Sequence, residues 1–281
     1  MKPAPFVYHR PASLEETFAL LDRYGADGRI LAGGQSLVPA LNMRLATPTA
    51  VIDINRLPGL DGIRVTPDGL AIGALVRQEA LARSAAVREH APLVAQAMPH
   101  VAHLAPRTRG TFGGSLALGD PAAELPACAV ALDATVRVAR RGGAVREIPA
   151  DRFFTGVYTT ALEPGELVTE ALIPRARPGW RSHFDELSRR HGDFALAGLA
   201  AHCHVAGGRI TEARLVYFGV GTTPVRALRA EAAVTTGRVD DAAAALDADL
   251  DPPSDVHASA AVRRQLARVL LRRAVARLTG S

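Results

Sequence analysis

Two glycine pairs in the first half of the chain limit what it can fold into. The first glycine loop, LAGGQSL at residues 31–37, joins a strand predicted at 29–32 to a helix predicted at 37–45. The second glycine loop, RGTFGGS at 109–115, leads toward a helix predicted at 122–132, with Pro121 near its first turn. Glycine lets the backbone approach a bulky anion, and a helix start offers unpaired N–H groups. The two loops therefore predict a bracket for a pyrophosphate, although two strand-to-helix turns without a ligand would show the same pattern.

Three polar side chains beside these loops have two readings each. Ser36 either caps the following helix or donates a hydrogen bond to the phosphate. Asp120 and Glu124 either accept hydrogen bonds from sugar or ribityl hydroxyls, or complement the positive N-terminal end of the predicted helix. The residues alone leave these alternatives open.

Missing motifs narrow the class of nucleotide site. No G-x-G-x-x-G follows a strand, which argues against a Rossmann fold, and no G-x-x-x-x-G-K-[ST] is present, which argues against a P-loop. Serine hydrolysis has no support because G-x-S-x-G is absent. In His202-Cys203-His204, a strand would point the cysteine away from both histidines, so we expect no metal site there.

Cysteine content and charge restrict the partners and the compartment. The two cysteines, Cys128 and Cys203, are too few for a usual iron–sulfur cluster and suit a reducing cytoplasm. The net charge of +5 comes from scattered arginines, and aromatic residues make up only 5%, so we expect no nucleic-acid partner. The first residues lack the apolar core of a signal peptide, and no run of 18 apolar residues predicts a membrane span.

The order of predicted elements divides the chain into two domains. Residues 1–176 alternate helices and strands, as a βαβ-like unit at about 1–56 and a second unit at 57–176. The segment RARPG at 175–179 is the best linker. Residues 177–281 hold three predicted strands followed by two predicted helices, which indicates an α+β domain with an antiparallel sheet.

These motifs carry a family resemblance. AGGQS at 32–36 and TFGGS at 111–115 resemble the two FAD signatures, AGG-x-S and T-[IVF]-GG-[NS], of the molybdopterin dehydrogenase flavoprotein family. Their order, their spacing of roughly eighty residues and the trailing DPAAELPA also match. The likeness continues at the segments FFTGVYTTALEPGELVTEALIP (153–174), RRHGDFALAG (189–198) and GVGTTPVRA (219–227), and so covers nearly the whole chain.

The resemblance implies a fold and a cofactor site. The fold is α+β: a two-part FAD-binding domain of the vanillyl-alcohol-oxidase type, then a small C-terminal α+β domain. FAD is held by backbone amides of both loops, with further contacts at the ribityl chain and the ring. Carried over by position, the implied contacts are Leu31, Ala32, Gly33, Gly34, Gln35, Ser36, Leu37, Val101, Thr111, Gly113, Gly114, Ser115, Asp120, Glu124, Leu167, Glu186 and Phe194.

Three of these positions depart from the family pattern. Ser115 stands where the family often has asparagine, and Phe194 lacks the hydroxyl of the tyrosine often found there. The family often has a lysine near the flavin ring in an F-x-K segment, where this chain reads Phe184-Asp185-Glu186. A positive charge there stabilises the reduced anion, and Glu186 has the opposite sign.

The function implied is electron transfer within an oxidoreductase. The chain is expected to be the cytoplasmic FAD subunit of a molybdenum hydroxylase. Two-iron two-sulfur clusters are expected on a small partner subunit, the molybdenum cofactor on a large one, and NAD or a quinone as acceptor. A self-contained flavin oxidoreductase is one alternative, although the C-terminal hundred residues offer few acid–base groups. A cofactor-free assembly or nucleic-acid-binding protein is the other.

Overall fold

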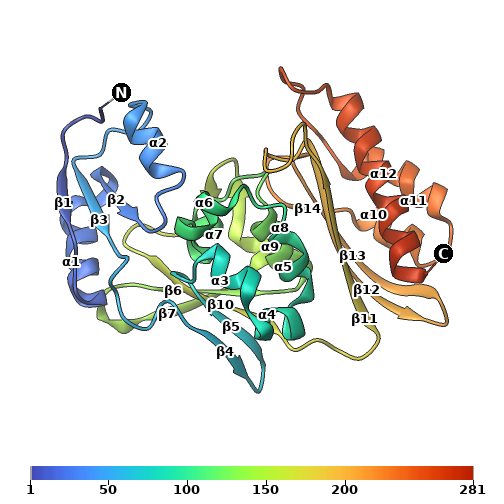
Figure 1. Cartoon of the computed structure of the whole chain (residues 1–281), viewed down its shortest axis with the longest axis horizontal. Helices are drawn as coiled ribbons and strands as arrows, with labels where there is room; N and C mark the ends of the chain where they lie inside the picture. The colour runs from blue at the N-terminus through green and yellow to red at the C-terminus, as the bar shows by residue number, and fades with distance from the viewer. Residues whose placement is uncertain (1, 281) are drawn as a thin grey trace.

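A computed structural model describes residues 2–280 as three adjoining units, which follow the chain from the N-terminus to the C-terminus across Figure 1. Each unit holds its own sheet, and the fold is α+β as predicted. No helix among the described residues is long and apolar enough to cross a membrane.

The first unit is a small parallel sheet with helices at its connections. Helix α1 begins where Ser13 accepts a hydrogen bond from Glu16 N at 3.1 Å, while the Glu16 carboxylate accepts one from Ala12 N. It ends at Gly25, whose φ of +49° lies in the region that favours glycine. The strands pair in the order β1-β3-β2. The elements are β1 (Val7–His9), α1 (Leu14–Tyr24), η1 (Gly25–Asp27), β2 (Gly28–Leu31), α2 (Leu37–Asn42) and β3 (Ala50–Asp53).

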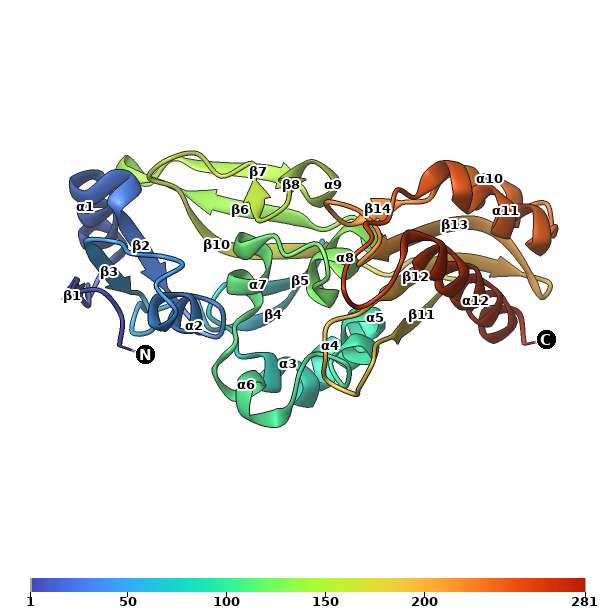
Figure 2. The same ribbon diagram turned by 90° about the horizontal axis from the view of Figure 1, so that it is seen from above.

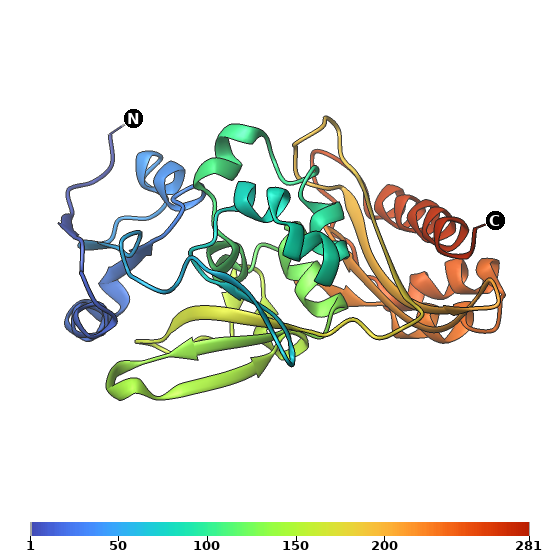
Figure 3. The same ribbon diagram turned by 60° about the horizontal axis from the view of Figure 1, so that its bottom comes forward.

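The second unit is a five-stranded antiparallel sheet of order β4-β5-β10-β6-β7, with short helices packed on one face (Figure 3). Buried Leu70, Ile72, Val136 and Val138 line that face and contact the helices. The strands of this sheet are β4 (Ile63–Thr66), β5 (Gly69–Gly73), β6 (Thr135–Ala139), β7 (Val145–Pro149) and β10 (Leu167–Pro174). A separate two-stranded sheet pairs β8 (Phe154–Gly156) with β9 (Thr159–Thr160). The helices are α3 (Gln78–Arg83), α4 (Ala85–His90), α5 (Pro92–Ala97), α6 (Leu104–Arg109), α7 (Phe112–Leu118), α8 (Glu124–Ala131), η2 (Arg141–Gly143) and α9 (Ala150–Phe153).

The third unit is a four-stranded antiparallel sheet, β11-β12-β13-β14, with the long helix α12 along one face (Figure 2). Its other face joins the second unit: Phe184, Ala200 and Phe218 belong to the same apolar cluster as the helices of that unit. The elements are β11 (Trp180–Leu187), β12 (Ala197–Ala206), β13 (Arg209–Phe218), β14 (Val225–Arg226), α10 (Leu228–Val234), α11 (Val239–Asp249) and α12 (Ala260–Thr279).

The structure corrects the sequence reading around the second glycine loop. Helix α7 begins at Phe112, so Gly113 and Gly114 lie inside a helix rather than in a turn before one. The next helix begins at Glu124, which leaves Pro121 outside its first turn. Glycine-rich composition hid α7, because glycine has a low intrinsic helix propensity and the helix depends on its packing against β5, β10 and α8.

Candidate functional site

The first glycine loop presents free backbone donors. The backbone N–H groups of Gly33, Gly34, Gln35 and Ser36 have no hydrogen-bond partner within residues 2–280. Gly34 has a φ of +73°, which glycine adopts without strain. Consecutive backbone N–H groups at such a bend form a concavity suited to an anion.

Ser36 does not cap α2. The residue has helical dihedral angles (φ −103°, ψ −43°) and its side chain makes no capping hydrogen bond. The capping alternative is therefore wrong. The exposed hydroxyl remains available to a ligand.

The second glycine loop is fixed by its contact with β5 and the residues that follow it. Thr111 caps α7, and its hydroxyl accepts a hydrogen bond from Gly114 N at 3.1 Å. Gly113 N donates to the Ala74 carbonyl at 2.9 Å, and a side chain on Gly113 would overlap Ala74. Gly113 is thus required for close packing, and Ser115 stays half-buried on the same helix.

The two loops abut one another. A Cβ atom on Gly33 would lie 2.5 Å from the Arg109 carbonyl oxygen and 2.7 Å from Gly110 Cα. Only glycine fits at this point, because real Cβ contacts are not that short. Residues roughly eighty positions apart therefore form one surface, as the sequence reading predicted.

A hydrogen-bonded bridge that sequence reasoning missed joins the loops. Asn55 Nδ2 donates to the Ala32 carbonyl at 2.7 Å, and Arg77 Nη2 donates to Asn55 Oδ1 at 2.6 Å. Arg77 Nη1 donates in turn to the Arg109 carbonyl at 2.5 Å. No motif marks Asn55 or Arg77, although Asn55 does follow the end of a buried strand.

Asp53 fixes the position of Asn55 in this bridge. Its carboxylate accepts hydrogen bonds from the hydroxyl of Tyr8 and from Asn55 N and Nδ2, and Arg10 lies 3.6 Å away. Burial works to raise the pKa of Asp53, but the hydrogen bonds from Tyr8 and Asn55 outweigh it and lower the pKa. The charged form of Asp53 therefore holds Asn55 in place.

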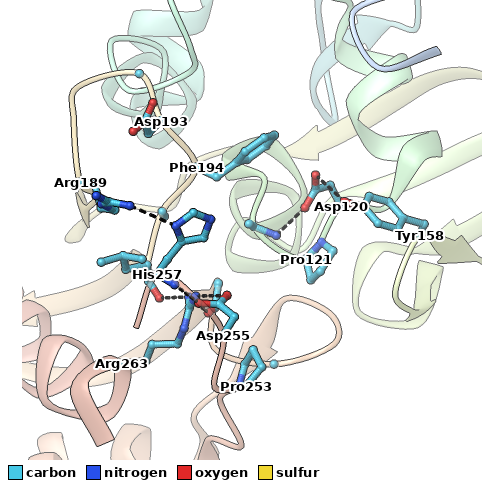
Figure 4. A pocket seen from close by; sticks show the side chains of 16 residues that line it. Asp120, Pro121, Tyr158, Arg189, Asp193, Phe194, Pro253, Asp255, His257 and Arg263 are labelled. Atoms are coloured by element: carbon cyan, nitrogen blue, oxygen red, sulfur yellow. Dashed lines mark hydrogen bonds and ion pairs between the residues drawn. The ribbon is translucent and has the colours of Figure 1, made fainter. Parts of the chain in front are cut away.

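A cavity of about 610 Å³ lies between the second and third units. Phe194 projects into it between Asp120 and Tyr158 on one side and Arg189 and His257 on the other (Figure 4). The Phe194 side chain is 69% exposed, which is unusual for a phenylalanine and leaves its ring open to a planar ligand. The pair Arg189 and His257 share a hydrogen bond of 3.3 Å.

Three predicted carboxyl groups lie near this cavity or below it. Burial raises the pKa of Asp120 despite hydrogen bonds from Ala122 N and Tyr158. Burial also raises the pKa of Glu124 to about 7. Burial and the charge of Glu124 raise the pKa of Glu186 to about 8. Because their pKa values are raised, these three buried acids bind a proton at higher pH than surface carboxylates do.

Two other predicted contacts are buried in apolar clusters. Val101 is 6% exposed, and its carbonyl accepts a hydrogen bond from Arg107 at 3.0 Å. Leu167 packs in the cluster of Phe18 and Leu21, which is separate from the cluster around Phe184. The backbone of Leu167 belongs to β10, where the residue pairs with Ala139 of β6.

The histidines do not form a metal centre. His202 and His204 lie on one face of β12, while Cys203 is buried on the other. His100 and His103 pack against Phe184 and His191. Within residues 2–280 no group of three metal-binding side chains converges.

The geometry fits FAD. Free amides at the first glycine loop suit the pyrophosphate, the carboxyl group of Asp120 suits hydroxyl groups, and the open ring of Phe194 suits a planar ring system.

Comparison with known proteins agrees with this geometry. The family model described as "FAD binding domain in molybdopterin dehydrogenase" matches residues 4–176, and "CO dehydrogenase flavoprotein C-terminal domain" matches residues 182–278. The alpha subunit of the 6-hydroxypseudooxynicotine dehydrogenase complex of Paenarthrobacter nicotinovorans is 41% identical over 99% of this chain and 95% of its own length.

Solved structures superpose closely. Carbon monoxide dehydrogenase from Hydrogenophaga pseudoflava gives a TM-score of 0.94 at 37% identity and covers 98% of this chain and 97% of its own. Quinoline 2-oxidoreductase from Pseudomonas putida 86 gives 0.93 at 36% identity and covers 100% and 99%. The fold is thus shared over the full described length.

Proposed function

Because this chain belongs to the family of FAD-binding medium subunits of molybdenum hydroxylases, we propose that it relays electrons from iron–sulfur clusters of a partner subunit to an external acceptor. The chain is an oxidoreductase subunit with an FAD-binding domain, and the cofactor-free alternative is wrong. Bound FAD supplies a carrier that accepts one or two electrons. The side chains and backbone of this chain bind, orient and shield it.

We assign the pyrophosphate to the free amides of Gly33, Gly34, Gln35 and Ser36. Their lack of internal partners is the single observation that carries the proposal, because consecutive free N–H groups at a glycine bend form a concavity suited to an anion. The second glycine loop closes the other side, and the bridge through Asn55 and Arg77 keeps the two loops in register. Asp120, which lines the cavity, is assigned to hydroxyl groups of the cofactor chain, whereas Glu124 is 8% exposed and does not line the cavity.

We assign the flavin ring and the approach of the acceptor to the cavity between the units. The exposed ring of Phe194 offers a stacking surface, and Arg189 with His257 offers positive and polar groups at the far side. NAD and quinones are planar rings with polar substituents, so they suit a cavity that combines the Phe194 ring with Arg189 and His257. No residue of this chain is assigned a proton transfer to or from the substrate.

Substrate chemistry is assigned to partners. The relatives act on unrelated molecules, to judge by their names: a nicotine derivative, carbon monoxide and quinoline. A shared medium subunit that only carries electrons accounts for this variety. We propose a small iron–sulfur subunit and a large molybdenum subunit as partners, and the cytoplasm as the compartment, which suits two free buried cysteines.

The test is cofactor binding by the full chain. The purified protein is mixed with FAD, washed free of excess cofactor and examined for flavin absorption, with the released cofactor identified by mass. Gly33→Ala is expected to lose the flavin, because its Cβ would overlap the Arg109 carbonyl. Gly62→Ala is the matched control, since its Cβ would meet only Arg64 at 4.0 Å. A colourless wild-type chain, even when co-expressed with cluster-bearing and molybdenum subunits, would overturn the proposal.

A further inference from the structure

Two acidic side chains are buried at the interface between the second and third units, one from each unit. Glu124 is the first residue of α8, and Glu186 lies near the end of β11; each is 8% exposed. Helix α8 packs against β12 and β13, and α5 packs against β11, so both carboxyl groups lie between the second and third units. We call Glu124 and Glu186 the interface acid pair.

Within residues 2–280, neither member of the pair has an arginine or a lysine as partner. Oε2 of Glu186 is buried and has no hydrogen bond within residues 2–280. Its Oε1 lies 3.7 Å from His100 Nδ1, which is too far for a hydrogen bond. The only donor that acts on the Glu124 carboxyl is its own backbone N–H, and no arginine or lysine lies within 4.0 Å of either acid.

The surroundings supply negative rather than positive charge. From α8, the Cys128 thiol is held neutral by burial, which raises its pKa, and the charges of both acids add to this. Near α5, burial lowers the pKa of His100 and favours its neutral form. On β11, Asp185 adds to the raised pKa of Glu186, although Asp185 pairs with Arg273 of α12 at 3.2 Å. On β12, Gly198 stands opposite Glu186 and brings no charge.

The pair is linked to the cavity that we assign to the flavin. Glu124 follows the segment 120–122, which lines the cavity, and the charge of Asp120 acts on Glu124. Strand β11 runs from Glu186 into the connection that carries Arg189 and Phe194. A charge that develops in the cavity therefore acts on the pair through a poorly solvated interior, where electrostatic interactions are strong.

We propose that the interface acid pair takes up a proton when bound FAD is reduced, so that the negative charge brought by the electrons is compensated inside this chain. The inference rests on the proposed function. The balance is FAD + 2 e⁻ + H⁺ → FADH⁻ at the flavin, together with R–COO⁻ + H⁺ → R–COOH at the pair. Two protons from solvent thus accompany two electrons from the iron–sulfur partner. Oxidation by the acceptor reverses both steps.

The pair is suited to this exchange because its members share one low-dielectric space. Burial already favours the neutral acid, and the charge of one member opposes ionisation of the other. Near neutral pH the pair therefore holds some but not all of its protons. A further negative charge nearby shifts that balance toward uptake.

The experiment measures how the reduction potential of the FAD-bound full chain depends on pH, with dithionite as reductant, between about pH 6.5 and 8.5. The wild-type slope is expected to be close to twofold that of Glu186→Gln near the upper end, because the variant has lost one proton per two electrons. Glu124→Gln is expected to lower the slope as well. Glu147→Gln, an exposed carboxylate on β7 paired with Arg137, is the control and should keep the wild-type slope.

A second readout separates failure of this inference from failure of the proposed function. The infrared carbonyl band of a protonated carboxyl group is expected at neutral pH, with or without FAD, and should weaken in Glu186→Gln. A wild-type chain that does not bind FAD contradicts the proposed function. Absence of the band, or equal slopes in wild type and both pair variants, contradicts the acid pair.

Discussion

Arg77 donates a hydrogen bond from Nη2 to Oδ1 of Asn55 at 2.6 Å, and through this contact the two glycine loops are joined. Asn55 holds the carbonyl of Ala32 in the first loop, and Arg77 holds the carbonyl of Arg109 before the second. Both donors bind backbone carbonyls, so the bridge orients the loops without occupying their free N–H groups. The consequence is a preorganised site for an anion.

Loss of the bridge should weaken FAD binding. Arg77→Met keeps much of the side-chain volume but removes the contacts to Asn55 and Arg109. We expect FAD affinity to fall about tenfold, which corresponds to about 1.4 kcal/mol. The measurement is a fluorescence titration of the flavin-free chain with FAD.

A second arginine provides the control for that variant. Arg88 also donates to backbone carbonyls, those of Ala82 and Arg83, but on α4 away from both loops. Arg88→Met should leave FAD affinity unchanged. Equal affinities of Arg77→Met and wild type would show that the loops keep their register without the bridge.

Removal of the cap of α7 should destabilise the second glycine loop. Thr111→Val removes the hydroxyl that accepts the Gly114 N–H, in a side chain that is 2% exposed. The expected cost is about 1 kcal/mol in the free energy of unfolding. Urea denaturation measures it, and Thr111→Ser, which keeps the hydroxyl, should recover most of the loss. A serine variant as unstable as the valine variant would assign the effect to packing of the methyl group.

Arg263 should be the most sensitive arginine of the third unit. It is 5% exposed, donates to the carbonyls of Leu196 and Gly219 at 2.7 and 2.9 Å, and pairs with Asp255. Gly219 N donates in turn to Pro121 O at 2.8 Å, so the same residue supports the junction between units. Arg263→Met leaves buried carbonyls without donors, and we expect a loss of roughly 2–4 kcal/mol in the free energy of unfolding.

The neighbouring residue is the matched control for Arg263. Arg264 makes a surface ion pair of 3.8 Å with Asp251, whose side chain is fully exposed. Arg264→Met should therefore change the free energy of unfolding by less than about 0.5 kcal/mol. Similar losses in both variants would contradict a special role for the buried arginine.

The stability of the flavin-free chain should fall as pH rises through the range where Glu186 ionises. Its folded pKa of about 8 lies above the ordinary value of 4.5, so the folded state binds more protons than the unfolded state between these values. The contribution is present in full below the unfolded pKa and is lost as pH rises through the folded pKa. Glu186→Gln should flatten this dependence and be the more stable protein above pH 8, by on the order of 1–3 kcal/mol.

Chemical denaturation at a series of pH values measures this difference. Glu147→Gln again serves as the exposed control and should follow the wild-type curve. Parallel curves for wild type and Glu186→Gln would show that Glu186 is ionised in the folded protein at neutral pH.

Several features of the fold were determined by the sequence itself. The capping box at Ser13 and the stop at Gly25 define α1, and the apolar run at 50–54 predicts β3, because these signals are local. The family resemblance carried by the two glycine loops implied the FAD-binding fold, which the structure and the relatives confirm. Local chemistry sufficed wherever neighbours along the chain set the conformation.

Only the tertiary structure decided which of these elements meet. The edge strand β1 is three residues long and β4 has two exposed members in its centre, so neither has a strong pattern of its own. Gly113 is helical because it packs on Ala74, and Asn55 and Arg77 are ordinary polar residues until the loops are brought together. Their roles depend on contacts between residues 22 or more positions apart, which no local sequence signal encodes.

The same reason explains the interface acid pair. From the sequence, Glu124 was either a partner of ribityl hydroxyls or a helix N-terminal charge, and Glu186 was an implied cofactor contact that departs from the family motif. A strand and a helix some sixty residues apart give no sign of facing one another. Packing of the third unit on α8 and α5 buries Glu124 and Glu186, and it leaves Oε2 of Glu186 without a hydrogen-bond partner within residues 2–280. Burial is a property of the assembled chain, and with it the folded structure sets the proton affinity of these two side chains.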